Sequence, residues 1–158
     1  MDANPRTLGV EVPAQRPALK ADELLVTGDI GGDWVIATPD LHAHARDPVD
    51  VRYVTNRCDE VHHVQGVPLA DLLGRLDLRV EPGHKMDRLN FVVLAHSEDG
   101  YRVVLSLAEV DPEFGGCSAI LATRYNGRLL TRPTLVTPRD ARSSRYVRGV
   151  CLLRVTRV

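Results

Sequence analysis

The stretch Gly66-Val67-Pro68-Leu69-Ala70-Asp71-Leu72-Leu73 decides the fold class of this chain. A strand-like apolar segment at residues 61–64 leads into it, and a proline follows at the start of a helical pattern. Apolar residues then recur at helical spacing, at Ala70, Leu72, Leu73 and Leu76. The stretch therefore predicts a strand that runs directly into a short helix.

Working outward from this stretch, most of the chain alternates between short apolar runs and turn residues. The predicted strands cover residues 24–26, 34–36, 49–54, 61–64, 89–95, 101–105, 119–122, 134–136 and 145–158. A short helix is expected after Thr38, which we take as its cap, and another helical turn at residues 107–110. Many short strands with few short helices predict an α+β fold, a β-rich mixed-sheet single domain.

Length and composition set the remaining bounds. The 158 residues fit one domain, which we place at residues 23–158 after a loosely ordered N-terminal arm at residues 1–22. A net charge of −1 gives no reason to expect a nucleic-acid partner. No apolar run is long enough for a membrane span, and no export signal is evident, so we expect a cytoplasmic protein. In that compartment Cys58, Cys117 and Cys151 are expected to be reduced thiols.

Several segments, in this order, resemble the molybdopterin-binding domain of the sulfite oxidase family. They are Leu25-Val26-Thr27-Gly28, the stretch at 66–73, Asp99-Gly100-Tyr101, Asn126-Gly127-Arg128-Leu129-Leu130, Leu135-Val136-Thr137-Pro138 and Arg145-Tyr146-Val147-Arg148-Gly149-Val150. The resemblance covers about residues 23–158. It implies the α+β fold of that family, in which a single cysteine thiolate holds a pterin-bound molybdenum.

In this chain, the position that corresponds to that cysteine is occupied by another residue type. Counting back from Gly66 places it at Val54, whereas alignment on Asn56-Arg57 places it at Tyr53. Neither side chain binds molybdenum as a thiolate does. Cys58 lies only eight residues before Gly66 and takes the role only if the loop is remodelled. The resemblance thus supports the fold better than the cofactor, so we expect no cofactor, with molybdopterin as the alternative.

The resemblance also implies an anion site just before the last strand. Where the family has a Gly-x-Lys element that grips the pterin phosphate, this chain has Ser143-Ser144-Arg145. Arg145 keeps a cation and the two serines keep hydroxyl donors, so an anion still finds partners there. The glycine is lost, and with it the close approach of backbone to phosphate.

The densest cluster of reactive side chains is Arg57, Cys58, Asp59, Glu60, His62 and His63. On a strand, His62 and His63 point to opposite faces, so at most one of them faces a pocket, and the sequence leaves open which. Cys58 and His63 are the candidate nucleophile and base, and His96 near the Asp99-Gly100 turn is a further proton-transfer candidate. The alternative is a polar loop that leads into a half-buried strand.

These observations leave three functions. The first is a stand-alone relative of the family without molybdenum, which binds a small polar or anionic metabolite through Arg57, His63, His96 and Arg145, as a binding protein or a cofactor-independent enzyme. The second is a molybdopterin-dependent oxidoreductase that uses Cys58. The third is a non-catalytic interaction module. The sequence predicts no metal site of its own, and it leaves homo-oligomerisation and the substrate open.

Overall fold

The computed structural model describes residues 18–158; the predicted arm at 1–22 therefore lies mostly outside the described residues. The strands are β1 (Glu23–Gly28), β2 (Trp34–Ala37), β3 (Val49–Val54), β4 (Asp59–Pro68), β5 (Phe91–Ser97), β6 (Arg102–Ser106), β7 (Ile120–Tyr125), β8 (Arg128–Val136) and β9 (Val150–Arg157). The helices are α1 (Thr38–His42), α2 (Leu69–Leu73) and α3 (Leu107–Val110), with a 3₁₀ turn η2 at Asp87–Asn90. This composition confirms the predicted α+β fold rich in strands.

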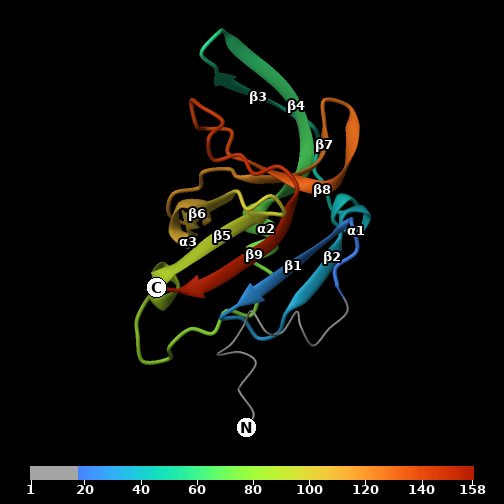
Figure 1. Ribbon diagram of the computed structural model, residues 1–158. Coiled ribbons are helices and arrows are strands. Elements are labelled where there is room, and N and C mark those ends of the chain that lie inside the picture. Colours follow the sequence, from blue (N-terminus) through green and yellow to red (C-terminus); the bar gives the residue numbers. More distant parts are fainter. Residues whose placement is uncertain (1–17) are drawn as a thin grey trace.

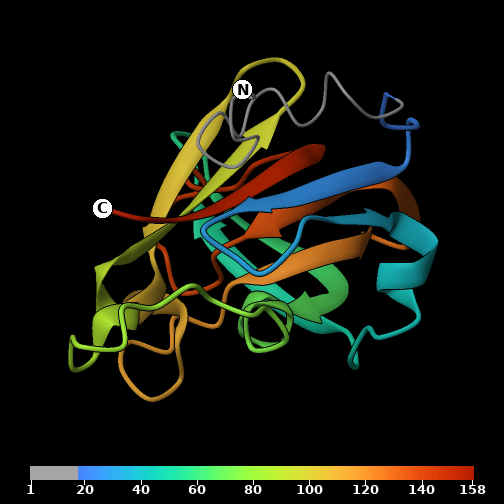
Figure 2. The same ribbon diagram turned by 90° about the horizontal axis from the view of Figure 1, so that it is seen from below.

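The strands form two sheets. A five-stranded sheet has the order β2-β1-β9-β5-β6, and a four-stranded sheet has the order β3-β4-β7-β8. Only the β1–β9 pair is parallel, and it brings the start of the described chain beside its end (Figures 1 and 2). All other neighbours are antiparallel. The first sheet is therefore mixed, as the sequence predicted.

A main core joins the two sheets. It contains inward-facing residues of both, such as Leu24, Val93 and Leu153 from the first sheet and Leu121 and Leu135 from the second. The leucines of α2 complete it, because the short helix turns its apolar side toward the same cluster. Burial of this aliphatic surface is the main stabilising contribution to the fold.

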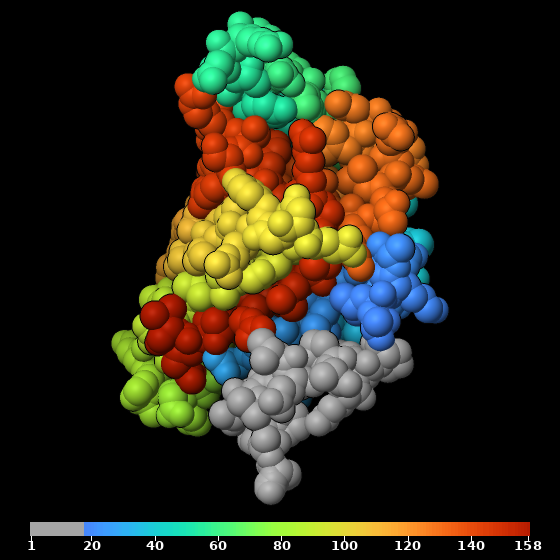
Figure 3. Space-filling view, in the orientation of Figure 1, coloured from blue at the N-terminus to red at the C-terminus, as the bar shows by residue number. Residues whose placement is uncertain are grey.

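A second, smaller core lies under the hairpin that β3 and β4 form. Its buried members are Val51, Tyr53, Val64, Ala122, Val136 and Tyr146. The hairpin projects beyond the rest of the molecule (Figures 1 and 3). One face of β3 is buried and the other is exposed, which is the alternation of a strand with a single packed face.

Strand β4 changes register as it passes from the hairpin into the main core. The irregularity lies between Gln65 and Gly66 in its pairing with β7. A Cβ added at Gly66 would lie 2.0 Å from the carbonyl oxygen of Leu121, so only glycine allows this approach of the two backbones. The predicted strand-to-helix stretch is confirmed, although Gly66, Val67 and Pro68 belong to the strand and the helix begins at Leu69.

Three local predictions were wrong. The final strand begins at Val150 and not at Arg145, because Gly149 has a positive φ of 66° that interrupts an extended chain. Strand β8 starts at Arg128 and includes Pro133, which the structure accepts at the edge of its sheet. Thr38 is not the cap of α1 but its first residue, and its hydroxyl donates to backbone carbonyls instead.

Within residues 18–158, no helix has the length and apolar character needed to cross a membrane.

The close contact at Gly66 gives a stability prediction. Gly66→Ala should lower the free energy of unfolding by about 2 kcal/mol, since overpacking a tight backbone contact costs ~1–3 kcal/mol. Urea denaturation measures it. Gly83→Ala is the control, because a Cβ there has no neighbour within 4 Å, and its effect should stay within about 0.5 kcal/mol. Equal effects of the two substitutions would show that the contact does not constrain β4.

Candidate functional site

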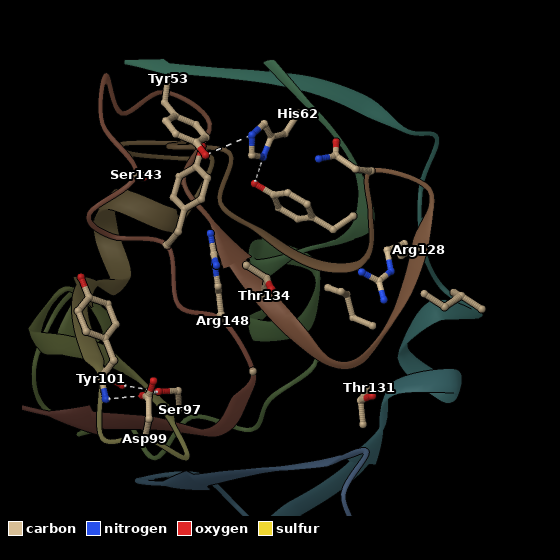
Figure 4. A pocket seen from close by; sticks show the side chains of 16 residues that line it. Tyr53, His62, Ser97, Asp99, Tyr101, Arg128, Thr131, Thr134, Ser143 and Arg148 are labelled. Atoms are coloured by element: carbon tan, nitrogen blue, oxygen red, sulfur yellow. Dashed lines mark hydrogen bonds between the residues drawn. The ribbon is translucent and has the colours of Figure 1, made fainter. Parts of the chain in front are cut away.

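A cavity of about 770 Å³ opens where the β3–β4 hairpin, the β7–β8 hairpin, the β5–β6 turn and the segment before β9 meet (Figure 4). Its lining is mostly polar and aromatic, and consists of Tyr53, His62, Ser97, Asp99, Tyr101, Tyr125, Asn126, Arg128, Leu129, Leu130, Thr131, Thr134, Ser143, Tyr146, Arg148 and Gly149. Elements far apart in the sequence thus contribute to one concave surface, which is the usual form of a small-molecule site.

Three aromatic rings and a carboxylate form a connected cluster at this wall. Tyr53 lies directly across from Glu60 in the β3–β4 pair, and His62 lies two residues further along the same face of β4. The ring centroid of His62 is 5.0 Å from that of Tyr53 and 5.1 Å from that of Tyr125, both in edge-to-face contact. The side chain of His62 is 16% exposed, so the imidazole is largely shielded from solvent.

The contact with Glu60 places a hydrogen on one nitrogen of His62. Its Nε2 lies 2.9 Å from Oε1 of Glu60, and an ionised carboxylate only accepts, so Nε2 carries the hydrogen. In the neutral imidazole, Nδ1 is then the acceptor, and the Tyr125 hydroxyl, 2.5 Å away, donates to it. The Tyr53 hydroxyl also donates to Glu60, at 3.3 Å. Both phenolic protons therefore point into the cluster and away from the cavity.

The phenols of this cluster stay neutral. Burial raises the pKa of Tyr125 far above its usual value, and the nearby Arg148 charge opposes that shift only in part. Burial, followed by the charge of Glu60, also raises the pKa of Tyr53. Burial raises the pKa of Tyr146 to about 12. The buried hydroxyl of Tyr146 has no hydrogen-bond partner among the described residues, and such an unsatisfied group costs roughly 1–3 kcal/mol.

Charged groups at the cavity differ in whether they are already engaged. Asp99 accepts hydrogen bonds from the Ser97 hydroxyl and from the backbone N–H of Tyr101 (3.0 Å), and these bonds hold its pKa below the usual value. Arg128 and Arg148 are exposed, and neither guanidinium group forms an ion pair or hydrogen bond with a side chain or carbonyl of residues 18–158. The cavity thus presents two cations that no carboxylate of the described residues neutralises.

The turn between β3 and β4 holds two of the predicted site residues away from this cavity. Cys58 is exposed, and its backbone N–H donates to the Thr55 hydroxyl at 3.1 Å. Arg57 is held in the same turn, where its N–H donates to that hydroxyl at 3.2 Å. Neither lines the cavity, because the turn forms the tip of the projecting hairpin.

Of the two adjacent histidines, it is His62 that faces the cavity. The prediction that His63 lines the site was wrong, because strand alternation turns it to the opposite face, where its imidazole contacts Asp50. His96 was also expected at the site. It lies half-buried in β5 outside the cavity, where burial, followed by the charges of Arg102 and Arg154, lowers its pKa.

Only one of the three residues of the predicted anion site at 143–145 lines the cavity. Ser143 lines the cavity, but Ser144 does not, and its carbonyl accepts from the Tyr101 hydroxyl. Arg145 is turned away and is already neutralised, since it donates to Asp140 (2.8 Å) and to Glu109 (2.7 Å). Its role is therefore to tie α3 to the segment before β9.

No sequence pattern pointed to Tyr125 and Tyr146 as members of the site. Arg128 and Arg148 belong to a run of arginines from Arg124 onward, for which a pocket for an anion was the alternative to a solvated basic face. The turn Asn126-Gly127 marks the place where Tyr125 and Arg128 meet the cavity, since the residues that flank a tight hairpin turn are cross-strand neighbours. Tyr53 appeared only as a position aligned with the family's cysteine. In residues 18–158, no group of three or more His, Cys, Asp or Glu side chains is placed to hold a metal ion.

Comparisons with known proteins bear on the fold. No family model and no curated protein matches the sequence. A solved structure, the sulfane dehydrogenase SoxCD from Paracoccus pantotrophus, matches with a TM-score of 0.64 and 15% identity. The match covers 89% of this chain but 40% of that chain, so this chain spans less than half the length of its neighbour. The chain therefore has an α+β fold similar to part of an oxidoreductase, as the resemblance implied.

The Asp140–Arg145–Glu109 contact predicts how stability depends on pH. Hydrogen bonds from Arg145 hold the pKa of Asp140 below its usual value. Burial alone would raise the pKa of Glu109, but bonds from Arg145 and Ser106 outweigh it and lower that pKa. Carboxyl groups with depressed folded-state pKa values stabilise the fold above their unfolded pKa and lose this effect as pH falls.

Arg145→Met should therefore cost about 1–2 kcal/mol at neutral pH, a figure reduced for partial exposure. It should cost progressively less below about pH 4, where the unfolded carboxyl groups become protonated. Thermal melts across that range measure the difference. The exposed Arg139→Met variant, which breaks no ion pair, should follow the wild-type curve. A pH-independent cost of Arg145→Met would contradict the electrostatic account.

Proposed function

We propose that this chain binds a small anionic metabolite in the cavity and that it does so without molybdenum. The observation that carries the proposal is the pair of cavity arginines, Arg128 and Arg148, neither of which is paired with a carboxylate of the described chain. Guanidinium groups bind carboxylate and phosphate groups through parallel hydrogen bonds. In contrast, the cations at Arg145 and Arg157 are neutralised by carboxylates of the protein itself.

The size and lining of the cavity suit a small ligand. Its volume of about 770 Å³ lies in the range of roughly 300–1,000 Å³ that holds metabolites. Hydroxyl groups also line the cavity, among them those of Thr131, Thr134 and Ser143. Such groups orient a ligand once a charged group has anchored it, which supports a polar metabolite with one anionic group.

The donor groups at the cavity do not fit a molybdenum held by a thiolate. No cysteine lines the cavity, and Cys58 is exposed at the tip of the hairpin. Tyr53, one of the two positions aligned with the family's cysteine, faces the cavity, whereas Val54 is 41% exposed. Since burial raises the pKa of Tyr53, its phenolate is disfavoured, and its hydroxyl is already bound to Glu60. This chemistry supports a site that has lost the metal.

An oxidoreductase that uses Cys58 is the second candidate, and the likeness to a sulfane dehydrogenase favours it. It requires the hairpin tip to fold back toward the cavity. The remaining alternative, an interaction module whose pocket is filled by side chains, is less well supported because the cavity is open and has arginine and hydroxyl side chains in its lining.

Binding of sulfate, a small oxyanion, tests the proposal. Titration calorimetry at low ionic strength should detect sulfate binding, and Arg148→Gln should weaken it roughly tenfold, equivalent to ~1.4 kcal/mol. Arg52→Gln is the matched control, since Arg52 is exposed on the face of β3 opposite Tyr53. It should leave the affinity unchanged. Equal losses of sulfate affinity in both variants would show that sulfate responds to general surface charge, which would contradict a specific site.

Elemental analysis separates the first candidate from the second. Protein purified from cells that make molybdopterin should contain no molybdenum, because the cavity offers no thiolate. Cys58→Ser should consequently change neither metal content nor sulfate affinity. Stoichiometric molybdenum that disappears in Cys58→Ser would establish the oxidoreductase instead.

A further inference from the structure

The direction of the hydrogen bonds at His62 limits what the cavity wall can offer a ligand. With His62 neutral, the Tyr125 proton is committed to Nδ1 and the Tyr53 proton to Glu60. Both hydroxyl oxygens then present only lone pairs to the cavity, and lone pairs repel an anion. With His62 neutral, the arginines therefore attract an anion, whereas the hydroxyl groups of Tyr53 and Tyr125 disfavour its binding beside them.

Protonation of His62 changes what the Tyr125 hydroxyl offers to a ligand in the cavity. Nδ1 then becomes a donor, so the Tyr125 oxygen accepts from the imidazolium and its own proton is free to rotate toward the cavity. The Nε2–H bond to Glu60 is kept, because a carboxylate accepts from either form. One added proton thus converts an acceptor at the wall into a donor and adds a positive charge behind it.

We propose that the ligand's oxyanion binds against Tyr125 together with one proton, which His62 holds. The inference rests on the proposed function, since it concerns the same cavity. It narrows the ligand to a compact oxyanion, such as a carboxylate, sulfo or phospho group, that accepts from Tyr125 on one side and from an arginine on the other. A neutral polar ligand gains nothing from the added charge.

The groups around His62 are consistent with one proton being taken up there. The titratable and charged residues that face it come from β3, β4, β7 and the segment before β9, and they are Tyr53, Glu60, Tyr125, Tyr146 and Arg148. The three phenols stay neutral near physiological pH, because burial raises their pKa values. Glu60 balances the imidazolium, and Arg148 is balanced only when an anion is bound.

Sulfate calorimetry at two pH values tests this coupling. Sulfate keeps its charge between about pH 5.5 and pH 8, so a change in its affinity over this range reports on the protein. The wild-type protein should bind sulfate at least tenfold more tightly at the lower pH. Titrations at an intermediate pH, in two buffers of different ionisation enthalpy, should reveal the uptake of up to one proton per sulfate.

Two adjacent histidines provide a matched pair of variants. His62→Gln should remove both the pH dependence and the proton uptake, whereas His63→Gln should behave as wild type, since His63 faces away from the cavity. Tyr125→Phe should weaken binding more at the lower pH than at the higher, because it removes the donor that protonation releases. Thermal melts of each variant confirm that it is folded.

The outcomes distinguish this inference from the proposed function. Sulfate affinity that is the same at both pH values, with no proton uptake, would overturn the inference and leave the proposed function standing. Proton uptake that survives in His62→Gln, or disappears in His63→Gln, would also overturn it. Absence of sulfate binding at either pH would overturn the proposed function itself.

Discussion

The close approach of β4 and β7 at Gly66 is the constraint on which the site depends. Because the backbones meet there without room for a side chain, β4 shifts register at one defined point. On one side of that point the strand delivers Val67 to the main core, and on the other it turns His62 toward the cavity. A slip by one residue would present His63 in place of His62.

The cavity follows from how the two sheets are joined. The main core holds β4, β7 and β8 against the larger sheet near their inner ends, while their outer ends diverge with the hairpins. The aromatic cluster of the smaller core closes this opening from one side, and the loop that ends at Gly149 closes it from another. Charged groups that would be costly in a sealed core, such as Arg128 and Arg148, are therefore gathered beside a cavity.

The fold of this chain is similar to part of a sulfane dehydrogenase, yet function resides in the site and not in the fold. At the site, Tyr53, a neutral tyrosine bound to Glu60 and His62, stands at one of the two positions where the resemblance implies a soft metal ligand, the other being Val54. Arginines bind anions, and the cavity holds two of them. These residues support the proposal that the cavity binds an oxyanion.

The sequence by itself determined the α+β class, the strand-to-helix stretch and most of the hairpins, because these depend on local periodicity and turn residues. It also reduced the choice at the projecting hairpin to His62 or His63 through strand alternation. Only the tertiary structure decided between them and brought Tyr125, Arg128 and Arg148 into the same cavity. Those residues come together through pairing between segments distant in the chain. The tertiary structure also excluded Arg145 from the site, because it pairs Arg145 with Asp140 and Glu109. No local sequence pattern encodes these contacts.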